Sequence, residues 1–133
     1  MGCELMVLDS SALVAIHLEE PGYQQLIARM RQAGGVAVGV PTLLETAIVL
    51  TSRLRRDVRP DLHAFLRHMD VQVVPFSEEH LDAAMEAFLR FGKGRHPAAL
   101  NFGDCMSYAV ASLSQQPLLY TGSDFAKTDL PPA

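Results

Sequence analysis

The sequence predicts a single α/β domain over residues 1–133, folded as a three-layer α/β/α sandwich around a short, mainly parallel sheet. Short apolar runs alternate with longer segments whose apolar residues follow helical spacing. The runs are continuous rather than alternating, as in strands that are buried on both faces. A chain of 133 residues that is 49% hydrophobic and 20% charged can form one core without disulfides. Helices on both faces of a parallel sheet account for these observations together.

The first half of the chain divides into two strands and three helices. An apolar run ends at Asp9, and a serine at position 10 or 11 can cap the helix that follows. Pro21-Gly22 and Gly34-Gly35 break the helical pattern on either side of the second helix. Thr42 and Glu45 have the spacing of a capping box at the start of the third helix. We therefore expect strands over 5–8 and 36–40, and helices over 10–20, 23–32 and 42–54.

The second half repeats this alternation. We expect a helix over 61–69, a strand over 71–75, a helix from Ser77, a loop over 92–97, a helix over 101–114, a short strand over 118–120 and a turn over 121–124. The helix from Ser77 carries apolar residues on one face at the spacing i, i+3, i+4, i+7 and i+8. This spacing predicts that the face packs into the core, and its residues are Leu81, Ala84, Met85, Phe88 and Leu89.

Charge and cysteine content exclude several classes of protein. The formal net charge is −4, which argues against a simple basic nucleic-acid binder. Cys3 and Cys105 form neither a disulfide framework nor a zinc site, because no further cysteine or grouped histidine accompanies them. No basic residue precedes an apolar run at the N-terminus, and the longest charge-free stretch, 105–123, is too polar to span a membrane. We therefore expect a cytoplasmic protein with no membrane segment.

Four acidic residues are expected at one edge of the predicted sheet. Asp9 and Asp124 follow strands, whereas Glu45 and Asp104 lie in the first turns of helices. In a parallel α/β sheet, ligands bind beyond the carboxyl ends of the strands. Each acid also has a purely structural explanation, respectively as a strand end, a turn residue, a capping-box partner and a complement to a helix N-terminus. Four independent coincidences at one edge are a weaker explanation than a shared site.

Such a cluster of acids predicts a divalent cation. Like charges in one pocket raise the pKa of one another and destabilise the fold, and a cation removes that cost. Oxygen ligands without cysteine or histidine favour Mg²⁺, with Mn²⁺ as the alternative. The reaction that suits this arrangement is metal-assisted hydrolysis of a phosphodiester bond. Without these four acids the chain carries equal numbers of acidic and basic residues, so the excess negative charge is that of the predicted site.

Four segments of the sequence resemble the motifs of PIN-domain ribonucleases. They are Val-Leu-Asp-Ser-Ser-Ala-Leu over 7–13, Leu-Glu-Thr-Ala over 44–47, Leu-Asn-Phe-Gly-Asp-Cys over 100–105, and Leu-Tyr-Thr-Gly-Ser-Asp-Phe over 119–125. Within that family they are most similar to the VapC-type toxins of bacterial type II toxin–antitoxin modules. The resemblance covers nearly the whole chain, and it implies an Mg²⁺-dependent endoribonuclease with a PIN-like fold.

The resemblance also implies roles for individual residues. Asp9, Glu45, Asp104 and Asp124 correspond to the family's acidic metal-binding quartet, with Asp9 and Asp104 as the most direct metal ligands and Glu45 and Asp124 completing the pocket directly or through waters. Family members often carry another acid at position 123, so Asp129 is the alternative to Asp124 for the fourth position. Residues that would orient the carboxylates or the waters on the metal are Ser10, Asn101 and Ser123.

The family resemblance implies three partners: an RNA substrate, with transfer RNA as one class, a VapB-type antitoxin in the active-site groove, and a second copy of the chain. The apolar residues of the helices from Ser10 and from Ser77 are candidates for the dimer face. Lys93 and Arg95 lie in a loop that leads toward the site, and we expect them to contact RNA phosphates.

Two other functions are open to the sequence. The first is a catalytically inactive PIN fold that binds RNA or an antitoxin, which the intact quartet disfavours. The second is an aspartate-nucleophile phosphatase, which is disfavoured because Ser11 stands where such enzymes carry a second aspartate.

Overall fold

Four parallel strands form the centre of the molecule. The computed structural model describes residues 5–131, so Cys3 lies outside the described residues. The strands run in the order β3-β2-β1-β4, and every neighbouring pair is parallel. This confirms the predicted parallel sheet, and the strands are β1 Leu5–Leu8, β2 Gly35–Gly39, β3 Val71–Val74 and β4 Leu118–Leu119.

The strand order fixes where a site can form. From β1 the chain moves outward through β2 to β3, and it then returns to place β4 on the other side of β1. The direction in which successive strands are added to the sheet therefore reverses between β1 and β4. Ligands of parallel α/β sheets bind beyond the carboxyl ends of the strands at such a point. Asp9 follows β1 directly, so it stands at this position.

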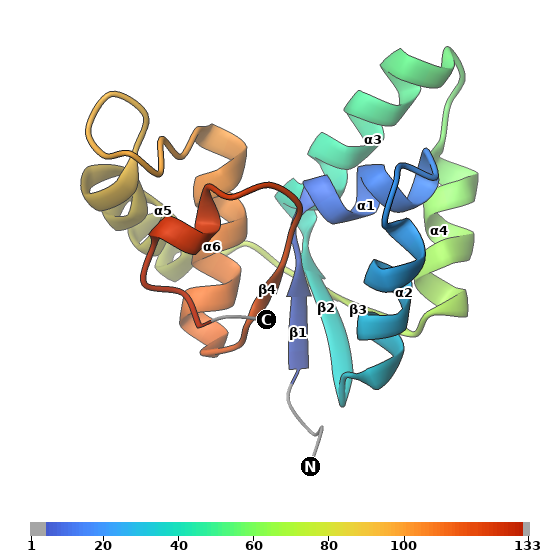
Figure 1. The fold of residues 1–133 in the computed structure, drawn as a ribbon, viewed down its shortest axis with the longest axis horizontal. Coiled ribbons are helices and arrows are strands. Elements are labelled where there is room, and N and C mark those ends of the chain that lie inside the picture. The colour runs from blue at the N-terminus through green and yellow to red at the C-terminus, as the bar shows by residue number, and fades with distance from the viewer. Residues whose placement is uncertain (1–4, 132–133) are drawn as a thin grey trace.

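Helices cover both faces of the sheet and give three layers (Figure 1). Helices α5 and α6 lie on one side, whereas α1, α2 and α4 lie on the other, and α3 projects beyond the carboxyl ends of the strands. The helices are α1 Ser10–His17, α2 Tyr23–Gln32, α3 Val40–Leu54, α4 Arg59–His68, α5 Glu78–Phe91, α6 Phe102–Ser114 and the 3-10 turn η1 Phe125–Lys127. No helix within residues 5–131 is long and apolar enough to cross a bilayer.

Alternate side chains of β1 supply the cores on the two faces of the sheet. Val7 packs with residues of α5 and α6, including Ala87, Tyr108 and Val110. Met6 and Leu8 point the other way and pack among residues of α1, α2, β2 and α4. Because both faces of the strand are covered, its sequence is continuously apolar, which is why the run could be recognised as a buried parallel strand.

Helix ends differ from the predictions for local reasons. Asp9, rather than a serine, caps α1, because its side chain accepts a hydrogen bond from the backbone N–H of Ser11. The predicted Thr42–Glu45 capping box is wrong, since α3 begins at Val40 and its N-cap is Gly39. Thr42 is therefore the third residue of the helix and not its cap, and both its hydroxyl and the Glu45 carboxylate are free for other contacts.

Most of the apolar face predicted for α5 lies outside the core: Ala84 packs against the core as predicted, but the prediction is wrong for Leu81, Met85, Phe88 and Leu89. Leu81 is 58% exposed, Met85 50% and Leu89 46%. Helix α5 packs against α6 through a different strip, where Ala87 and Phe91 are buried. Helical spacing identifies an apolar face, but it does not say which element covers that face.

Candidate active site

Asp9 is a buried carboxylate surrounded by donors. It follows β1 and is only 3% exposed. Its Oδ2 accepts hydrogen bonds from the backbone N–H of Ser11 at 3.0 Å and from the Ser11 hydroxyl at 2.6 Å. Its Oδ1 accepts from the Ser107 hydroxyl at 2.6 Å. Burial of a charged carboxylate is costly unless donors replace the lost water, and these three bonds supply that replacement.

Asp104 lies where the electrostatic influence of the other three acids converges. It stands in the first turn of α6, and its Oδ2 accepts from the backbone N–H of Asn101 at 3.0 Å. The pKa of Asp104 is raised to about 6, mainly by burial and further by the negative charges of Asp9, Glu45 and Asp124, against the lowering effect of the Asn101 bond. The structure thus brings all four predicted acids into one electrostatic neighbourhood.

Glu45 reaches this neighbourhood from α3. Burial raises its pKa, and the charge of Asp9 raises it further, whereas a hydrogen bond with the Ser10 side chain lowers it. The Glu45 carboxylate lies against the α-carbon of Gly103, where a β-carbon would stand 2.6 Å from Glu45 Cδ. A residue with a side chain at position 103 would therefore displace the carboxylate.

The two acids proposed for the fourth position occupy different environments. Asp124 is exposed directly before η1, and its charge acts on Asp104. Asp129 instead accepts a hydrogen bond from the Tyr108 hydroxyl at 2.5 Å and pairs with Arg90 at 3.2 Å. Asp129 therefore ties the C-terminal segment to α5 and α6, and the geometry favours Asp124.

The other residues predicted to support the site or bind RNA differ in the contacts that they make. The Ser10 side chain lowers the pKa of Glu45, and Asn101 Oδ1 accepts from the backbone N–H of Asp104 at 2.9 Å. Ser123 is exposed in the turn after β4. Lys93 is exposed, whereas Arg95 donates to the Leu89 carbonyl and its guanidinium lies 5.8 Å from the Phe88 ring centre. The Arg95 head group thus rests on α5.

Four residues of this region were not identified from the sequence: Ser11, Thr42, Gly103 and Ser107. Ser107 and Thr42 are fully buried, and the two hydroxyl oxygens are 3.2 Å apart. A hydroxyl within an otherwise apolar helix face is the signal that could have identified Ser107, because buried polar groups require a partner. Gly103 lies inside the Asn-Phe-Gly-Asp segment, but nothing in its local sequence shows that Glu45 approaches it.

The carboxylate oxygens of this site are the kind of ligand that a hard cation prefers, but they do not form a complete set of ligands by themselves. Within residues 5–131 no three histidine, cysteine, aspartate or glutamate side chains converge closely enough to hold an ion together. Mg²⁺ keeps several of its waters and needs only one or two direct carboxylates. These residues can therefore supply one or two direct ligands to the ion, while the other acids act through its waters.

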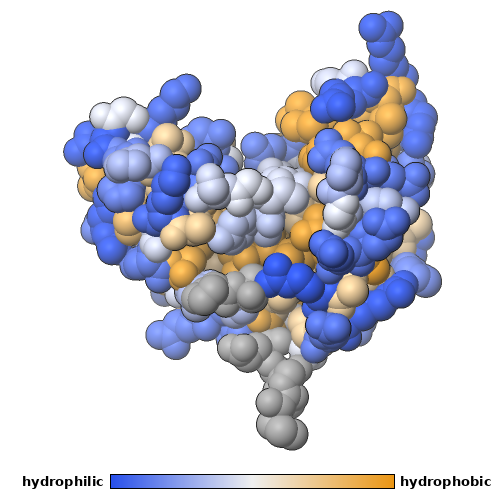
Figure 2. Space-filling view, in the orientation of Figure 1, coloured by the Kyte–Doolittle hydropathy of each residue, from blue (hydrophilic) through white to orange (hydrophobic). Residues whose placement is uncertain are grey.

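The acids lie at the carboxyl edge of the sheet. Figure 2 shows a notch in the molecular surface between the lobe of α5 and α6 and the lobe that contains α3. Fold and site together define an α/β protein with an acidic site at the carboxyl edge of a parallel sheet.

Comparison with known proteins places the chain in a family. Residues 6–130 match the PIN domain family. Ribonuclease VapC36 of Mycobacterium tuberculosis is 44% identical over 126 residues, which cover 94% of this chain and 91% of that protein. The chain therefore belongs to the PIN-domain family, among the VapC ribonucleases.

Two solved structures share the fold at low sequence identity. The structure of VapC20 of Mycobacterium tuberculosis, described as a toxin that cleaves the sarcin–ricin loop, has a TM-score of 0.73 at 18% identity, covering 96% of this chain and 98% of that one. A chain of a toxin–antitoxin complex from Klebsiella pneumoniae has a TM-score of 0.69 at 15% identity, covering 93% and 92%. Both confirm the predicted PIN-like architecture.

Proposed function

We propose that this protein is a metal-dependent endoribonuclease that acts in the cytoplasm as the toxin of a type II toxin–antitoxin module. The observation that carries the proposal is the meeting of four acids at the sheet edge, where the charges of Asp9, Glu45 and Asp124 all act on Asp104. Unneutralised carboxylates in one place destabilise a fold, so their retention favours a functional cation site. Membership of the VapC ribonucleases supports RNA as the substrate.

In this proposal Asp9 and Asp104 bind Mg²⁺ directly, and Glu45 and Asp124 act through waters. Mn²⁺ is the alternative ion. When bound, the ion would promote ionisation of the attacking water and stabilise the leaving oxygen. The chain's own contribution is to hold the carboxylates: Ser11 and Ser107 fix Asp9, Asn101 fixes Asp104, and Ser10 and Gly103 define the place of Glu45.

Expression in a bacterial host tests the toxin role. We expect induction of the wild-type chain to arrest growth, and co-expression of its VapB-type antitoxin to relieve the arrest. Mapping of new RNA 5′ ends would identify the substrate, with transfer RNA and ribosomal RNA as the two classes to compare. Growth arrest by Asp9→Asn at equal protein level would instead favour the inactive RNA- or antitoxin-binding module.

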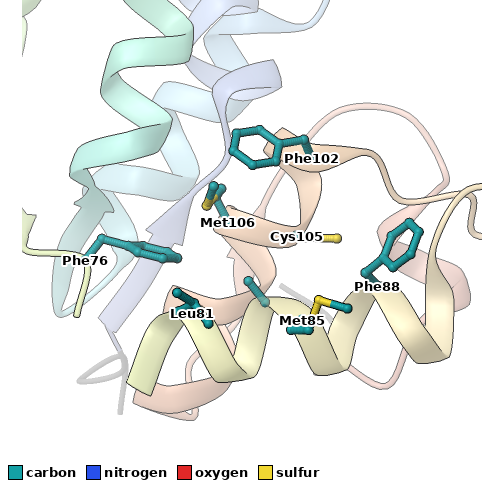
Figure 3. Close-up of a pocket in the computed structure, with 8 residues that line it drawn as sticks. Phe76, Leu81, Met85, Phe88, Phe102, Cys105 and Met106 are labelled. Carbon is teal, nitrogen blue, oxygen red and sulfur yellow. The ribbon is translucent and has the colours of Figure 1, made fainter. Parts of the chain in front are cut away.

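We also propose that a second copy of the chain covers the exposed apolar surface of α3, α5 and α6. One groove of about 400 Å³ runs between α5 and α6 and includes Leu81, Met85, Phe102 and Met106 (Figure 3). A second groove, of about 690 Å³, extends from Phe102 and Met106 to α3, with Leu44, Ile48 and Glu45 in its walls. Phe102 is 80% exposed and lines both grooves, and a large exposed apolar patch of this kind marks an interaction site.

This surface differs from the dimer face predicted from the sequence. The proposed surface includes α5, one of the two helices predicted from the sequence, but not α1, whose Ala12, Leu13, Ala15 and Ile16 are buried within the chain. A second copy suits an apolar surface of this kind because a two-fold interface pairs the surface with itself. The antitoxin is expected in the active-site groove instead, and Lys93 and Arg95 remain candidates for contacts with RNA phosphates.

A further inference from the structure

A chain of buried hydroxyl groups joins the three elements that carry Asp9, Glu45 and Asp104. The Ser107 hydroxyl donates to Asp9 Oδ1 at 2.6 Å, and the Thr42 hydroxyl lies 3.2 Å from Ser107 Oγ. Ser107 is 0% exposed and Thr42 1% exposed. The chain therefore runs from α3 through α6 to the end of β1, entirely within the protein.

The direction of the hydrogen bonds follows from the number of protons. A hydroxyl has one proton to donate. Ser107 gives its proton to the Asp9 carboxylate, which can only accept when ionised. The Ser107 oxygen is then an acceptor for Thr42, so the Thr42 hydroxyl donates to it. The series Thr42 to Ser107 to Asp9 thus ends on the carboxylate, and each bond strengthens the next.

The two hydroxyls are placed one helical turn from the acids on their own helices. Thr42 precedes Glu45 by three residues on α3, and Ser107 follows Asp104 by three residues on α6. Residues three apart lie on the same side of a helix. A bond between Thr42 and Ser107 therefore fixes the two helices together immediately below the acids, and the bond to Asp9 fixes both helices to β1.

We propose that Thr42 and Ser107 are positioning residues that set the separation of the Asp9, Glu45 and Asp104 carboxylates. This inference rests on the proposed metal-dependent function of those acids. Loss of the hydroxyl chain would weaken cation binding and lower kcat, while KM for RNA would change little because neither hydroxyl reaches the surface.

Thr46 provides a matched control on the same helix. It is also 0% exposed, but its hydroxyl donates to the Thr42 carbonyl at 2.8 Å, within α3 itself. Thr46→Val and Thr42→Val remove the same buried group by the same isosteric change. Only Thr42→Val interrupts the series that leads to Asp9.

The test measures Mn²⁺ binding to the RNA-free protein by titration calorimetry, together with kcat, KM and the thermal unfolding midpoint. We expect Ser107→Ala to weaken Mn²⁺ binding and lower kcat by about 10- to 100-fold. Thr42→Val should act in the same direction with a smaller effect, and Ser107→Cys, which keeps a weak donor, should fall between Ser107→Ala and wild type. Thr46→Val should stay within about twofold of wild type in Mn²⁺ affinity and kcat.

The order of the hydrogen bonds, from Thr42 through Ser107 to Asp9, gives a second test of the proposal. If Thr42 acts only through Ser107, then Thr42→Val should have no additional effect on Mn²⁺ affinity in a Ser107→Ala background. Equal Mn²⁺ affinity and kcat in Thr42→Val, Ser107→Ala and Thr46→Val would overturn the proposal, whatever their unfolding midpoints.

Failure of the proposed function is distinguishable from failure of this inference. If the wild-type protein neither binds Mn²⁺ nor cleaves RNA, the function is wrong, and crystal structures of the variants decide the positioning role. The Asp9 carboxylate should then be displaced in Ser107→Ala and unchanged in Thr46→Val. An undisplaced carboxylate in Ser107→Ala would refute the role.

Discussion

The carboxylate of Glu45 rests against the α-carbon of Gly103, where a β-carbon would stand 2.6 Å from Glu45 Cδ. The two residues come from different helices, and the contact brings Glu45 beside Asp104. Any side chain at position 103 must therefore move the end of Glu45. Because the far end of a glutamate is flexible, this movement costs the fold little but displaces the group that the site uses.

We predict that Gly103→Ala lowers the rate of RNA cleavage by about 10- to 100-fold without lowering the thermal unfolding midpoint. Alanine is a better helix former than glycine, which offsets the local crowding. Cleavage kinetics and thermal denaturation of the same preparation check both parts. In a Glu45→Asp background, where the shorter acid leaves room for the new methyl group, Gly103→Ala should lower the rate less than it does in the wild-type background. A rate within twofold of wild type in Gly103→Ala would contradict the role of this contact.

The pH dependence of stability should reveal the acidic cluster. The folded-state pKa of Asp104 is raised from 3.8 to about 6, so between these values the folded protein holds a proton that the unfolded chain has lost. The stability that this proton contributes is fully present below pH 3.8 and is lost as the pH rises through about 6. We therefore predict that, in EDTA, the unfolding midpoint of wild type falls between pH 4 and 7 relative to that of Asp104→Asn. Parallel pH profiles for the two proteins would show that Asp104 is not perturbed in this way.

Substitutions of Asp124 and Asp129 should affect different properties, RNA cleavage in the first case and stability in the second. We predict that Asp124→Asn lowers cleavage while leaving the unfolding midpoint nearly unchanged, since Asp124 is exposed. Asp129→Asn should keep cleavage near the wild-type rate and lower the free energy of unfolding by about 1 kcal/mol, because it weakens the contacts with Tyr108 and Arg90. Denaturant titration and cleavage assays of the pair decide the assignment. The reverse pattern would place Asp129 in the site.

The apolar surface should control the oligomeric state. If the proposed dimer forms through this surface, Leu81→Glu on α5, at a position that is 58% exposed, should convert it to a monomer with an intact fold. Leu113→Glu is the matched control, because Leu113 is 45% exposed on α6 but lies outside both grooves. Light scattering at several concentrations measures the molar mass. A wild-type chain that is already monomeric without its antitoxin would exclude a second copy and favour the antitoxin as the partner of this surface.

The sequence predicted the sheet and the acidic edge because both follow from strong local signals. Continuous apolar runs such as Leu5–Leu8 identify buried parallel strands, and strand direction then places Asp9 and Asp124 at one edge. The contacts that hold the acids depend on tertiary structure. Ser107 and Thr42 are 65 positions apart, and nothing in either local sequence shows that their hydroxyls meet.

Two predictions made from the sequence are wrong for the same physical reason. The amphipathic pattern of α5 predicted a core face, but the helix meets α6 through Ala87 and Phe91 and leaves Leu81 and Met85 exposed. The Thr42–Glu45 spacing predicted a capping box, but the helix starts earlier, at Val40. Local spacing identifies which residues share a helix face or turn, and only the packing of distant elements decides what they contact.

Cleavage of RNA by the purified protein tests the central claim most directly. The measurement compares wild type with Asp9→Asn on total cellular RNA, in EDTA and after restoration with excess Mg²⁺. We predict no cleavage in EDTA, recovery of cleavage with Mg²⁺ for wild type, and no recovery for Asp9→Asn, which loses one charge of the acidic cluster and whose folded state is checked by circular dichroism. Cleavage that persists in EDTA and in Asp9→Asn would contradict a metal-dependent site built on these four acids.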